Sequence, residues 1–446
     1  MTRLRNFFKL FAIICLGFSF ISAHAVLNLE LKQGVRSALP IAIVPFESVE
    51  SLPGELQVST IVAHDLTYSG EFSVLTEKLP QTPHSIAEIQ VSRWHGFAAQ
   101  YVVVGSIASM GSDHYKVSVS LVNLYRESTD KVSPTSVVLT KVYTVEKNQL
   151  RRLGHQISDE VYYALLGTPG VFTSKIAYIL VQPGKEPARP DYHLMVADYD
   201  GHNAQSAAAS NQPMMSPAWS PDGRQVAFVS FQKTLPAIFI ADILTGQLQQ
   251  VTALAGINGA PAWSPDGKRI AFVSSKTGYA KLYEIDLQSQ QIKQLTDGYS
   301  IDTEPCYMPN GKSVVFTSSR GGTPQVYKYN FANKSVERLT YTGDYNASPT
   351  VSPDGKQMAV LHKNASGFNI GVQQLDTDQF KVLTKDNEAE SPKFAPNGKL
   401  ILYATHTGNK HVLAIVSIDG QIHIVLPASE GNVQEPSWAG GANFLK

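Results

Sequence analysis

The sequence predicts a multidomain protein in which a small mixed α/β N-terminal domain is followed by an all-β six-bladed β-propeller. Three observations lead to this fold class. A proline phrase recurs at a nearly constant step in the second half of the chain, four strand-like runs fill each period, and the segment before the repeat has no period. Four strands in each unit of about 40–45 residues are typical of a propeller blade.

The recurring prolines are separated by 44, 44, 44, 43 and 44 residues. They are Pro217, Pro261, Pro305, Pro349, Pro392 and Pro436. Five of them open a phrase that ends in Asp-Gly or Asn-Gly, as in Pro217-Ala-Trp-Ser-Pro-Asp-Gly223. Glycine reaches positive φ easily, and Asp or Asn bonds within its own turn. We therefore interpret these aspartates as turn residues and expect no metal site and no catalytic acid among them.

Each period continues with β-branched and aromatic runs, which favour strands. The second and third strands of the first full period are expected at 225–230 and 237–242. The fourth strands are expected to end in Val251-Thr252, Leu295-Thr296, Leu339-Thr340 and Leu383-Thr384. The first unit, with runs at 176–181 and 193–197, lacks an opening strand, and residues 435–439 are left over. We expect this last strand to complete the first blade and to close the ring, which removes two free sheet edges.

The segment 26–168 reads as the N-terminal α/β domain. Strands are expected at 40–45, 101–105, 115–122 and 137–143. Amphipathic helices are expected at 55–68 and 149–166, where apolar residues recur every three or four positions. The Gly-Thr-Pro-Gly run at 167–170 ends the second helix, so the propeller is assigned to 169–446.

Residues 1–25 are expected to be a secretory signal peptide. Basic residues begin the segment, an apolar run spans 10–21, and Ala23-His24-Ala25 fits cleavage after Ala25. Removal of three of the 37 basic residues, against 37 acidic ones, leaves a formal charge of −3. This balance gives no reason to expect nucleic-acid binding. No other segment is apolar enough for direct membrane insertion, and Cys306 alone cannot form an intramolecular disulfide.

Few residues of the sequence indicate a catalytic or ligand-binding site. The sequence contains no G-x-S-x-G elbow, H-E-x-x-H motif or P-loop. His64-Asp65 is the nearest pair to a dyad, but adjacent helical residues diverge, so a surface or domain-contact role is expected. Trp219, Trp263 and Trp438 could form a ligand-stacking ring, although packing between blades is the simpler interpretation. No catalytic residue and no cofactor is predicted.

The whole chain resembles the TolB family, the periplasmic component of the Tol-Pal system. The resemblance is carried by its opening, by its domain order and by its propeller phrases. These are residues 33–38 (Gln-Gly-Val-Arg-Ser-Ala), 40–46 (Pro-Ile-Ala-Ile-Val-Pro-Phe), 258–267, 275–278, 303–305 and 324–328. It implies a non-enzymatic periplasmic scaffold that binds the lipoprotein Pal at the propeller mouth and TolA through the mature N-terminus. Such a protein maintains outer-membrane integrity and supports invagination during cell division, and colicin-type toxins exploit the same mouth in some species.

The residues before the six prolines should ring one mouth. They are Ser216, Ala260, Glu304, Ser348, Ser391 and Glu435. Small residues would admit a partner loop and the acids would receive its donors. On the resemblance, the expected Pal contacts also include Asn258, Gly259 and Thr303. Ile257 stands where the family often has histidine, so no polar contact is expected from it.

The second site is the tail 26–37, where apolar and polar residues alternate as in an extended strand. The expected TolA contacts are Val26, Leu27, Asn28, Leu29, Glu30, Leu31 and Lys32. A strand of this kind can add to a partner's sheet edge. The alternatives are a strand docked on the chain's own α/β domain and a disordered tail, and we expect the tail to switch between docked and free states that Pal binding biases. Two other function classes stay open: a secreted propeller hydrolase or lyase, and a glycan-binding propeller.

Overall fold

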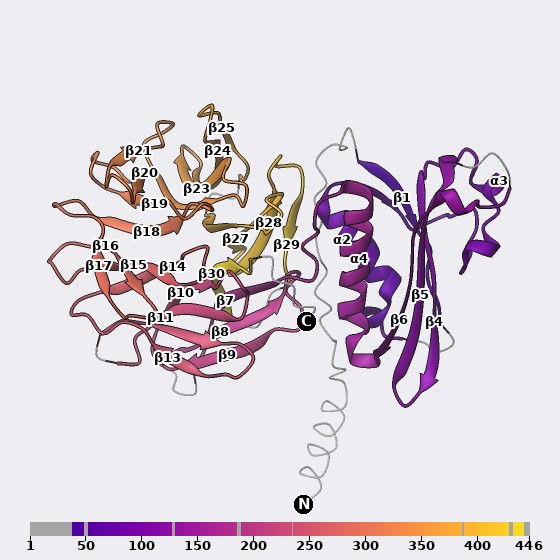
Figure 1. Ribbon diagram of the computed structural model, residues 1–446, viewed down its shortest axis with the longest axis horizontal. Helices are drawn as coiled ribbons and strands as arrows, with labels where there is room; N and C mark the ends of the chain where they lie inside the picture. The colour runs from indigo at the N-terminus through magenta and orange to yellow at the C-terminus, as the bar shows by residue number, and fades with distance from the viewer. Residues whose placement is uncertain are drawn as a thin grey trace, which may run out of the picture.

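The computed structural model describes residues 38–48, 52–126, 130–184, 189–233, 235–385, 388–427 and 431–440. They form a mixed α/β domain beside a ring of six four-stranded sheets, as the sequence predicts (Figure 1). The expected signal peptide and the tail 26–37 lie outside the described residues. No described helix combines the length and the hydropathy that crossing a membrane requires.

The N-terminal domain is built on one mixed sheet with the strand order β3-β1-β4-β5-β6 and with β2 beside β4. Strand β1 runs parallel to β3 and β4, whereas β4, β5 and β6 form an antiparallel meander. The strands are β1 (Leu39–Ile43), β2 (Glu47–Ser48), β3 (Phe72–Leu75), β4 (Tyr101–Gly111), β5 (His114–Asn123) and β6 (Val137–Glu146). All four strands expected here are present, and β2 and β3 are additional.

Two helices cover one face of this sheet and separate it from the propeller (Figure 1). They are α2 (Val58–Ser69) and α4 (Leu150–Leu166), and a short helix α3 (Val91–Trp94) lies on the opposite face. Single 3₁₀ turns occur at Gly54–Leu56, Ile86–Glu88, Leu124–Arg126, Pro134–Ser136 and Lys147–Gln149. The predicted start of the first helix at residue 55 is wrong. Gln57 has extended backbone, with φ −74° and ψ 101°, so the helix begins afresh at Val58.

The propeller blades follow the chain in order, and each is an antiparallel sheet. Blade 1 contains β30 (Asn432–Trp438), β7 (Lys175–Gln182), β8 (Asp191–Asp198) and β9 (Gln205–Ser210). Blade 2 contains β10 (Met214–Trp219), β11 (Gln225–Ser230), β12 (Ala237–Asp242) and β13 (Leu248–Gln250). Blade 3 contains β14 (Asn258–Trp263), β15 (Arg269–Ser274), β16 (Lys281–Asp286) and β17 (Ile292–Gln294).

The second half of the ring repeats the pattern. Blade 4 contains β18 (Asp302–Tyr307), β19 (Ser313–Ser318), β20 (Gln325–Asn330) and β21 (Val336–Arg338). Blade 5 contains β22 (Asn346–Val351), β23 (Gln357–Asn364), β24 (Gly367–Gln374) and β25 (Phe380–Val382). Blade 6 contains β26 (Glu390–Phe394), β27 (Leu400–Thr407), β28 (Lys410–Ser417) and β29 (His423–Val425).

The ring closes in blade 1, as the spare strand predicts. Strand β30 pairs antiparallel with β7, and Trp438 lies opposite Ile176. The indole Nε1 of Trp438 donates to Ser174 Oγ at 2.7 Å, and that of Trp263 donates to Ala218 O at 3.0 Å. Together with Trp219, these tryptophans are buried in hydrophobic clusters. They pack the blades and do not form a ligand-stacking ring.

The Asp-Gly phrase builds a turn, as predicted. Ser220 Oγ donates to Asp222 Oδ1 at 2.6 Å, and the same carboxylate oxygen accepts from Arg224 N at 3.1 Å. Gly223 takes φ +69°. In the equivalent turns the serine hydroxyl and backbone N–H groups hold the pKa of Asp266 and of Asp354 below its usual value. The aspartates are occupied by their own turns.

The predicted ends of the fourth strands are wrong. Strand β13 ends at Gln250, before Val251-Thr252, and β17, β21 and β25 also stop before their apolar-Thr pair. The threonine hydroxyl accepts from a backbone N–H of the third strand, as Thr252 Oγ1 does from Ile238 N at 3.0 Å. The bond recurs for Thr296, Thr340 and Thr384. A side chain thus replaces the ladder partner, and regular pairing stops there.

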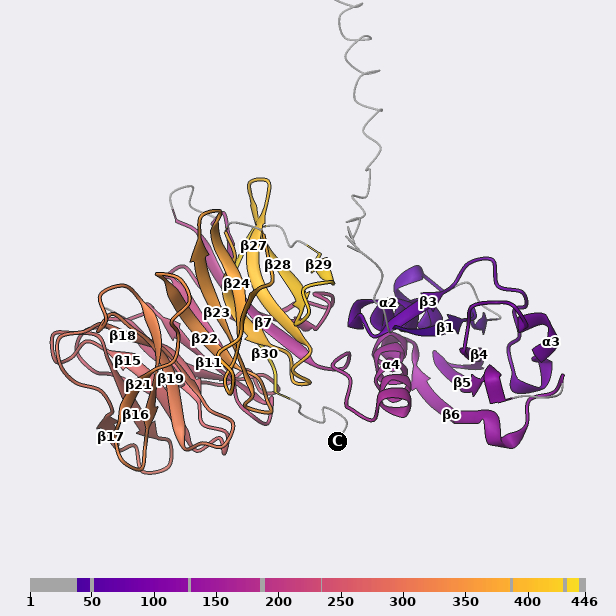
Figure 2. The same cartoon turned by 90° about the horizontal axis from the view of Figure 1, so that it is seen from above.

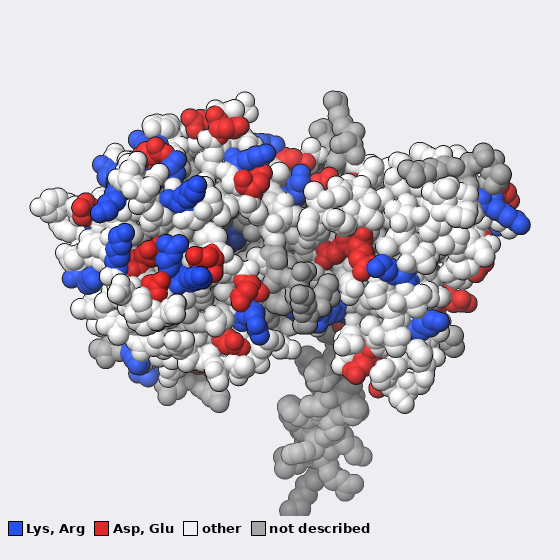
Figure 3. All heavy atoms as spheres, viewed as in Figure 1, with Lys and Arg blue, Asp and Glu red and all other residues white. Residues whose placement is uncertain are grey.

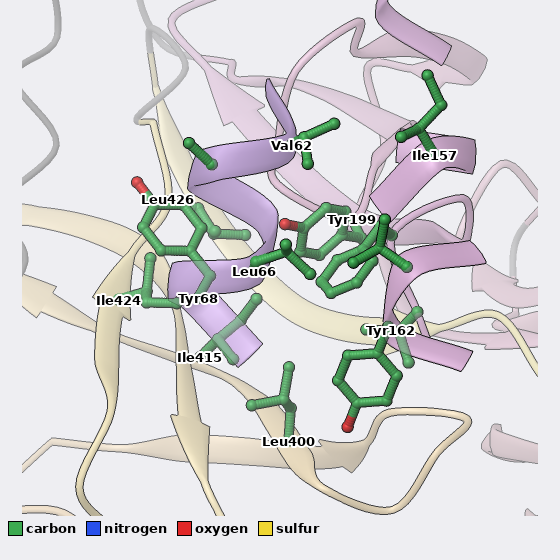
Figure 4. Packing of buried hydrophobic residues seen from close by; sticks show 14 of the residues in the cluster. Val62, Leu66, Tyr68, Ile157, Tyr162, Tyr199, Leu400, Ile415, Ile424 and Leu426 are labelled. Atoms are coloured by element: carbon green, nitrogen blue, oxygen red, sulfur yellow. The ribbon is translucent and has the colours of Figure 1, made fainter. Parts of the chain in front are cut away.

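The two domains share one hydrophobic cluster. Leu66 and Tyr68 of α2 pack with Ile415, Ile424 and Leu426 of blade 6 (Figure 4). Since each apolar side chain of this size contributes about 1.5–3 kcal/mol when buried, the domains form a single packed unit.

Buried polar groups cross the same interface. Asp65 of α2 accepts from Tyr199 Oη at 2.7 Å and lies 2.8 Å from Nδ1 of His155 in α4. Tyr199 follows β8 in the propeller, and Asp65 is only 2 % exposed. Asp65 is therefore a domain-contact residue, which is one of the two roles expected for the His64-Asp65 pair. His64 beside it is exposed and takes no part in these bonds.

Candidate functional site

One cavity of about 440 Å³ opens at the end of the inner strands, in the middle of the ring. All six residues that precede the repeat prolines line it, as do Gly259 and Thr303. The six positions therefore surround one mouth, as the sequence predicts. Asn258 differs from the others. Its side chain is fully buried, and Nδ2 donates to Leu254 O at 2.8 Å and Pro236 O at 3.1 Å. Asn258 anchors the loop before the mouth and does not line it.

A bulge in each inner strand directs these six residues into the mouth. In blade 2, Met215 pairs with Val229 and Ala218 pairs with Ala227, so two residues face one. The residue before each proline has positive φ, between +46° at Ala260 and +53° at Ser216 and Ser391. This conformation costs a non-glycine residue about 1–2 kcal/mol. A bulge residue is normally right-handed or left-handed, and proline disfavours the right-handed form for the residue before it, so these residues adopt the left-handed form.

The two acidic members of the ring already have donors. Oε2 of Glu304 accepts from Ser348 N at 2.9 Å and from Thr317 Oγ1 at 2.7 Å. Glu435 accepts from Ser216 Oγ at 3.0 Å and from Ser216 N at 2.5 Å. Ser348 and Ser216 each belong to the next blade. The carboxylates thus link adjacent blades, and their role as acceptors for a partner's donors stays a prediction.

Two charged residues at the mouth were not predicted. Glu390 and Lys393 of β26 line the cavity together with the six positions. Lys393 stands where the earlier phrases have Ala218 and Ala262, and this departure from the repeat is a signal that sequence reasoning could have used. Burial raises the pKa of Glu390 and that of Glu435, and Glu390 raises the latter further. Three carboxyl groups against one lysine make the mouth acidic.

Apolar side chains continue the mouth outward. Ile257, which lines the cavity, is 58 % exposed, and Ile301, one period later, is 56 % exposed. Tyr279 and Tyr299 stack edge to face nearby in the sequence, with ring centroids 5.6 Å apart. Figure 3 shows the face of the molecule that is seen in Figure 1. On this face acidic and basic side chains are interspersed over both domains, and no broad basic area is present.

A second group of ionisable residues lies at the domain interface. His155, Asp198 and Asp200 have ligand atoms within 4.8 Å of one another, close enough for a metal ion. Each carboxylate already has a basic side chain as its ion-pair partner: Arg151 contacts Asp200, and Lys175 Nζ lies 2.5 Å from Asp198. These bonds neutralise the carboxylates, so the group is an internal ion-pair network.

The comparisons with known proteins agree with this architecture. The model of the TolB amino-terminal domain matches residues 27–129, and that of the TolB beta propeller domain matches residues 162–441. The Tol-Pal system protein TolB of Coxiella burnetii is 55 % identical over 419 residues, which are 94 % of each chain. That of Legionella pneumophila (strain Corby) is 56 % identical over 413 residues, or 93 % of this chain and 94 % of the relative.

A solved structure is similar along nearly the whole chain. The crystal structure of TolB from Acinetobacter baumannii superposes with a TM-score of 0.82 at 39 % identity, covering 93 % of this chain and all of the other. Both the sequence and the arrangement of the two domains are therefore shared. The chain belongs to the TolB family, whose members are non-enzymatic periplasmic proteins of the Tol-Pal system.

Proposed function

We propose that this protein is a periplasmic scaffold that binds Pal through the propeller mouth and TolA through its mature N-terminal residues. In this role it maintains outer-membrane integrity and supports invagination during division. The observation that carries the Pal proposal is the convergence of six fixed backbone positions on one acidic cavity. Family membership makes Pal and TolA the partners to test first.

The mouth is suited to a single loop of a partner. A cavity of about 440 Å³ accommodates a few side chains but not a folded domain. Its bulges are fixed by proline, and the Glu304–Ser348 and Glu435–Ser216 links hold adjacent blades together. A preorganised site loses little entropy on binding, because few of its groups have to be ordered. The acids and the exposed Ile257 favour a loop that carries donors and one apolar side chain.

Gly259 offers the sharpest test of the mouth. A Cβ at this position meets no heavy atom within 4 Å, and the backbone is not left-handed. Gly259→Trp should therefore fold normally and fill the cavity. Its affinity for soluble Pal should fall at least tenfold, which corresponds to about 1.4 kcal/mol, in isothermal titration calorimetry.

Gly54→Trp is the matched control, because Gly54 of the N-terminal domain also has free space around its Cβ. It should bind Pal like the unaltered protein. Equal Pal affinity of the Gly259 variant would exclude the mouth as the binding site. Absence of Pal binding by the unaltered protein would reject the proposed function itself.

For TolA we propose strand addition by the alternating residues Val26 to Lys32. We further propose export by residues 1–25 with cleavage after Ala25, which N-terminal sequencing of the exported protein checks. Deletion of 26–37 from the mature chain should abolish binding to soluble TolA in a pull-down while the Pal affinity of the mouth stays within twofold. Retained TolA binding would show that the tail is not the contact, and loss of both partners would indicate a misfolded variant, which a thermal melt identifies.

A further inference from the structure

Two histidines face each other near the tip of blade 6. His406 of β27 and His411 of β28 are directly opposite in the strand register. Their Nε2 atoms are hydrogen-bonded at 2.8 Å, one donating and the other accepting, and their rings are 3.7 Å apart between centroids with an interplanar angle of 57°. Gly408 has φ +60° in the two-residue turn that joins the strands, which fixes the register. The pair is therefore held by short, regular backbone (Figure 2, yellow hairpin).

A carboxylate lies behind the first histidine. Oε2 of Glu388 is 2.9 Å from Nδ1 of His406, on the side of the ring away from His411. The separation is that of an ion pair, although the groups are not aligned as a hydrogen bond. A carboxylate at the outer nitrogen favours the tautomer with hydrogen on Nδ1, and it leaves the Nε2 lone pair free. Carboxylate, histidine and metal in this order recur in protein metal sites.

The separation of the two Nε2 atoms suits chelation. Zn–N distances of about 2.0–2.1 Å at a tetrahedral angle require nitrogens about 3.3 Å apart. At 2.8 Å the two nitrogens are hydrogen-bonded to each other, so chelation requires the rings to turn apart until both lone pairs face one ion. Both side chains are only partly buried, so an ion has access from solvent. Unlike the His155 group, this pair carries no lysine or arginine ion pair in the described part of the chain.

We propose that His406 and His411 form a bidentate site for a divalent transition ion, Zn²⁺ or Cu²⁺, with Glu388 as the residue that positions His406. Binding of the ion replaces the hydrogen bond between the two rings: the hydrogen of that bond moves to Nδ1 of the same ring, both Nε2 lone pairs bind the ion, and water completes the coordination. Imidazole ligands select Zn²⁺ and Cu²⁺ over Ca²⁺ and Mg²⁺. Glu390, two residues from Glu388, lines the mouth, so the ion would lie beside the mouth and outside the six-residue ring.

Titration of zinc into the mature, tag-free protein tests the site. We expect one zinc per chain, and loss of this binding in both His406→Gln and His411→Gln. Glu388→Gln should weaken it about 10- to 100-fold, the usual cost of removing such a partner. His193→Gln is the matched control, because His193 is a partly buried histidine of blade 1 whose ring nitrogen Nδ1 lies 3.3 Å from Ser206 Oγ. It should bind zinc like the unaltered chain.

Cu²⁺ gives an independent reading. Its electron paramagnetic resonance spectrum should show hyperfine splitting from two nitrogens, reduced to one in either histidine variant. The proposal is overturned if zinc affinity is the same in His406→Gln and His411→Gln as in the unaltered protein, or if the copper spectrum shows no histidine nitrogen. Neither measurement involves Pal or TolA, so failure here leaves the proposed scaffold function untouched.

Discussion

Six residues without the freedom of glycine hold positive φ at the mouth of the propeller. The repeat keeps Ser, Ala and Glu there, although glycine would remove the steric cost of this conformation. Strained backbone of this kind gathers at functional sites, where the surrounding structure over-determines it. At Glu304 and Glu435 the side chain also links two blades, which glycine could not do. The residues thus combine a fixed backbone with side-chain bonds across the ring.

Ala260 and Ala262 allow the cost of this conformation to be measured. Both are partly buried alanines of β14, but only Ala260 has positive φ. Ala260→Gly relieves strain of about 1–2 kcal/mol and loses about 0.4–1 kcal/mol through the freer unfolded chain, so stability should stay level or rise. Ala262→Gly has only the loss of about 0.5–1 kcal/mol. Urea unfolding of the two variants should differ by about 1 kcal/mol or more, and equal destabilisation would contradict the strain argument.

At the scale of strands and helices, much of the propeller could be predicted from its period. Strands β11 and β12 lie at the expected 225–230 and 237–242, and β30 completes blade 1. The fourth strands were extended too far because Thr252 and its counterparts look like strand residues, while their hydroxyls end the ladder. The bulges were not predicted either, because the pattern of apolar residues carries no information about the backbone angle φ. The sequence predicted where the mouth lies. It could not predict that Glu304 bonds to Ser348, which lies 44 residues later in the next blade.

At the scale of the whole molecule, the interface between the domains was the part that the sequence could not predict. His155 and Tyr199 lie 90 and 134 residues after Asp65, and no short sequence motif contains all three. Apolar periodicity in α4 predicted the helix but not the partner of its buried polar residues. Arg151 and Asp200 extend this network at the same interface. The domains therefore share polar bonds as well as a hydrophobic core.

This interface should make stability depend on pH. Burial lowers the pKa of His155, but Asp65 and Asp200 raise it, and the net shift is upward. A histidine whose pKa is raised on folding contributes stability that is complete below about pH 6.5 and lost as pH rises through the folded-state value. Urea unfolding should therefore give a lower free energy at pH 8.5 than at pH 6.

Asp65→Asn removes the charge that raises this pKa. At pH 6 the variant should be less stable by about 3–5 kcal/mol, the usual effect of breaking a buried pair. Its decline between pH 6 and pH 8.5 should be reduced. His193→Gln, which replaces a partly buried histidine outside the interface network, should keep the decline of the unaltered protein. An unchanged decline in Asp65→Asn would mean that another group governs this pH range.

The closure of blade 1 by β30 has a consequence for how the chain is made. Synthesis proceeds from the N-terminus, and domains generally fold in that order. Here α2 packs on Ile415, Ile424 and Leu426, which are made hundreds of residues later, and β7 has no inner neighbour until β30 appears. Until its last segment is made, a nascent chain thus exposes an apolar helix face and an unpaired strand edge. The segment from Ile415 to Trp438 completes both, so we expect the last folding step to wait for the end of the chain.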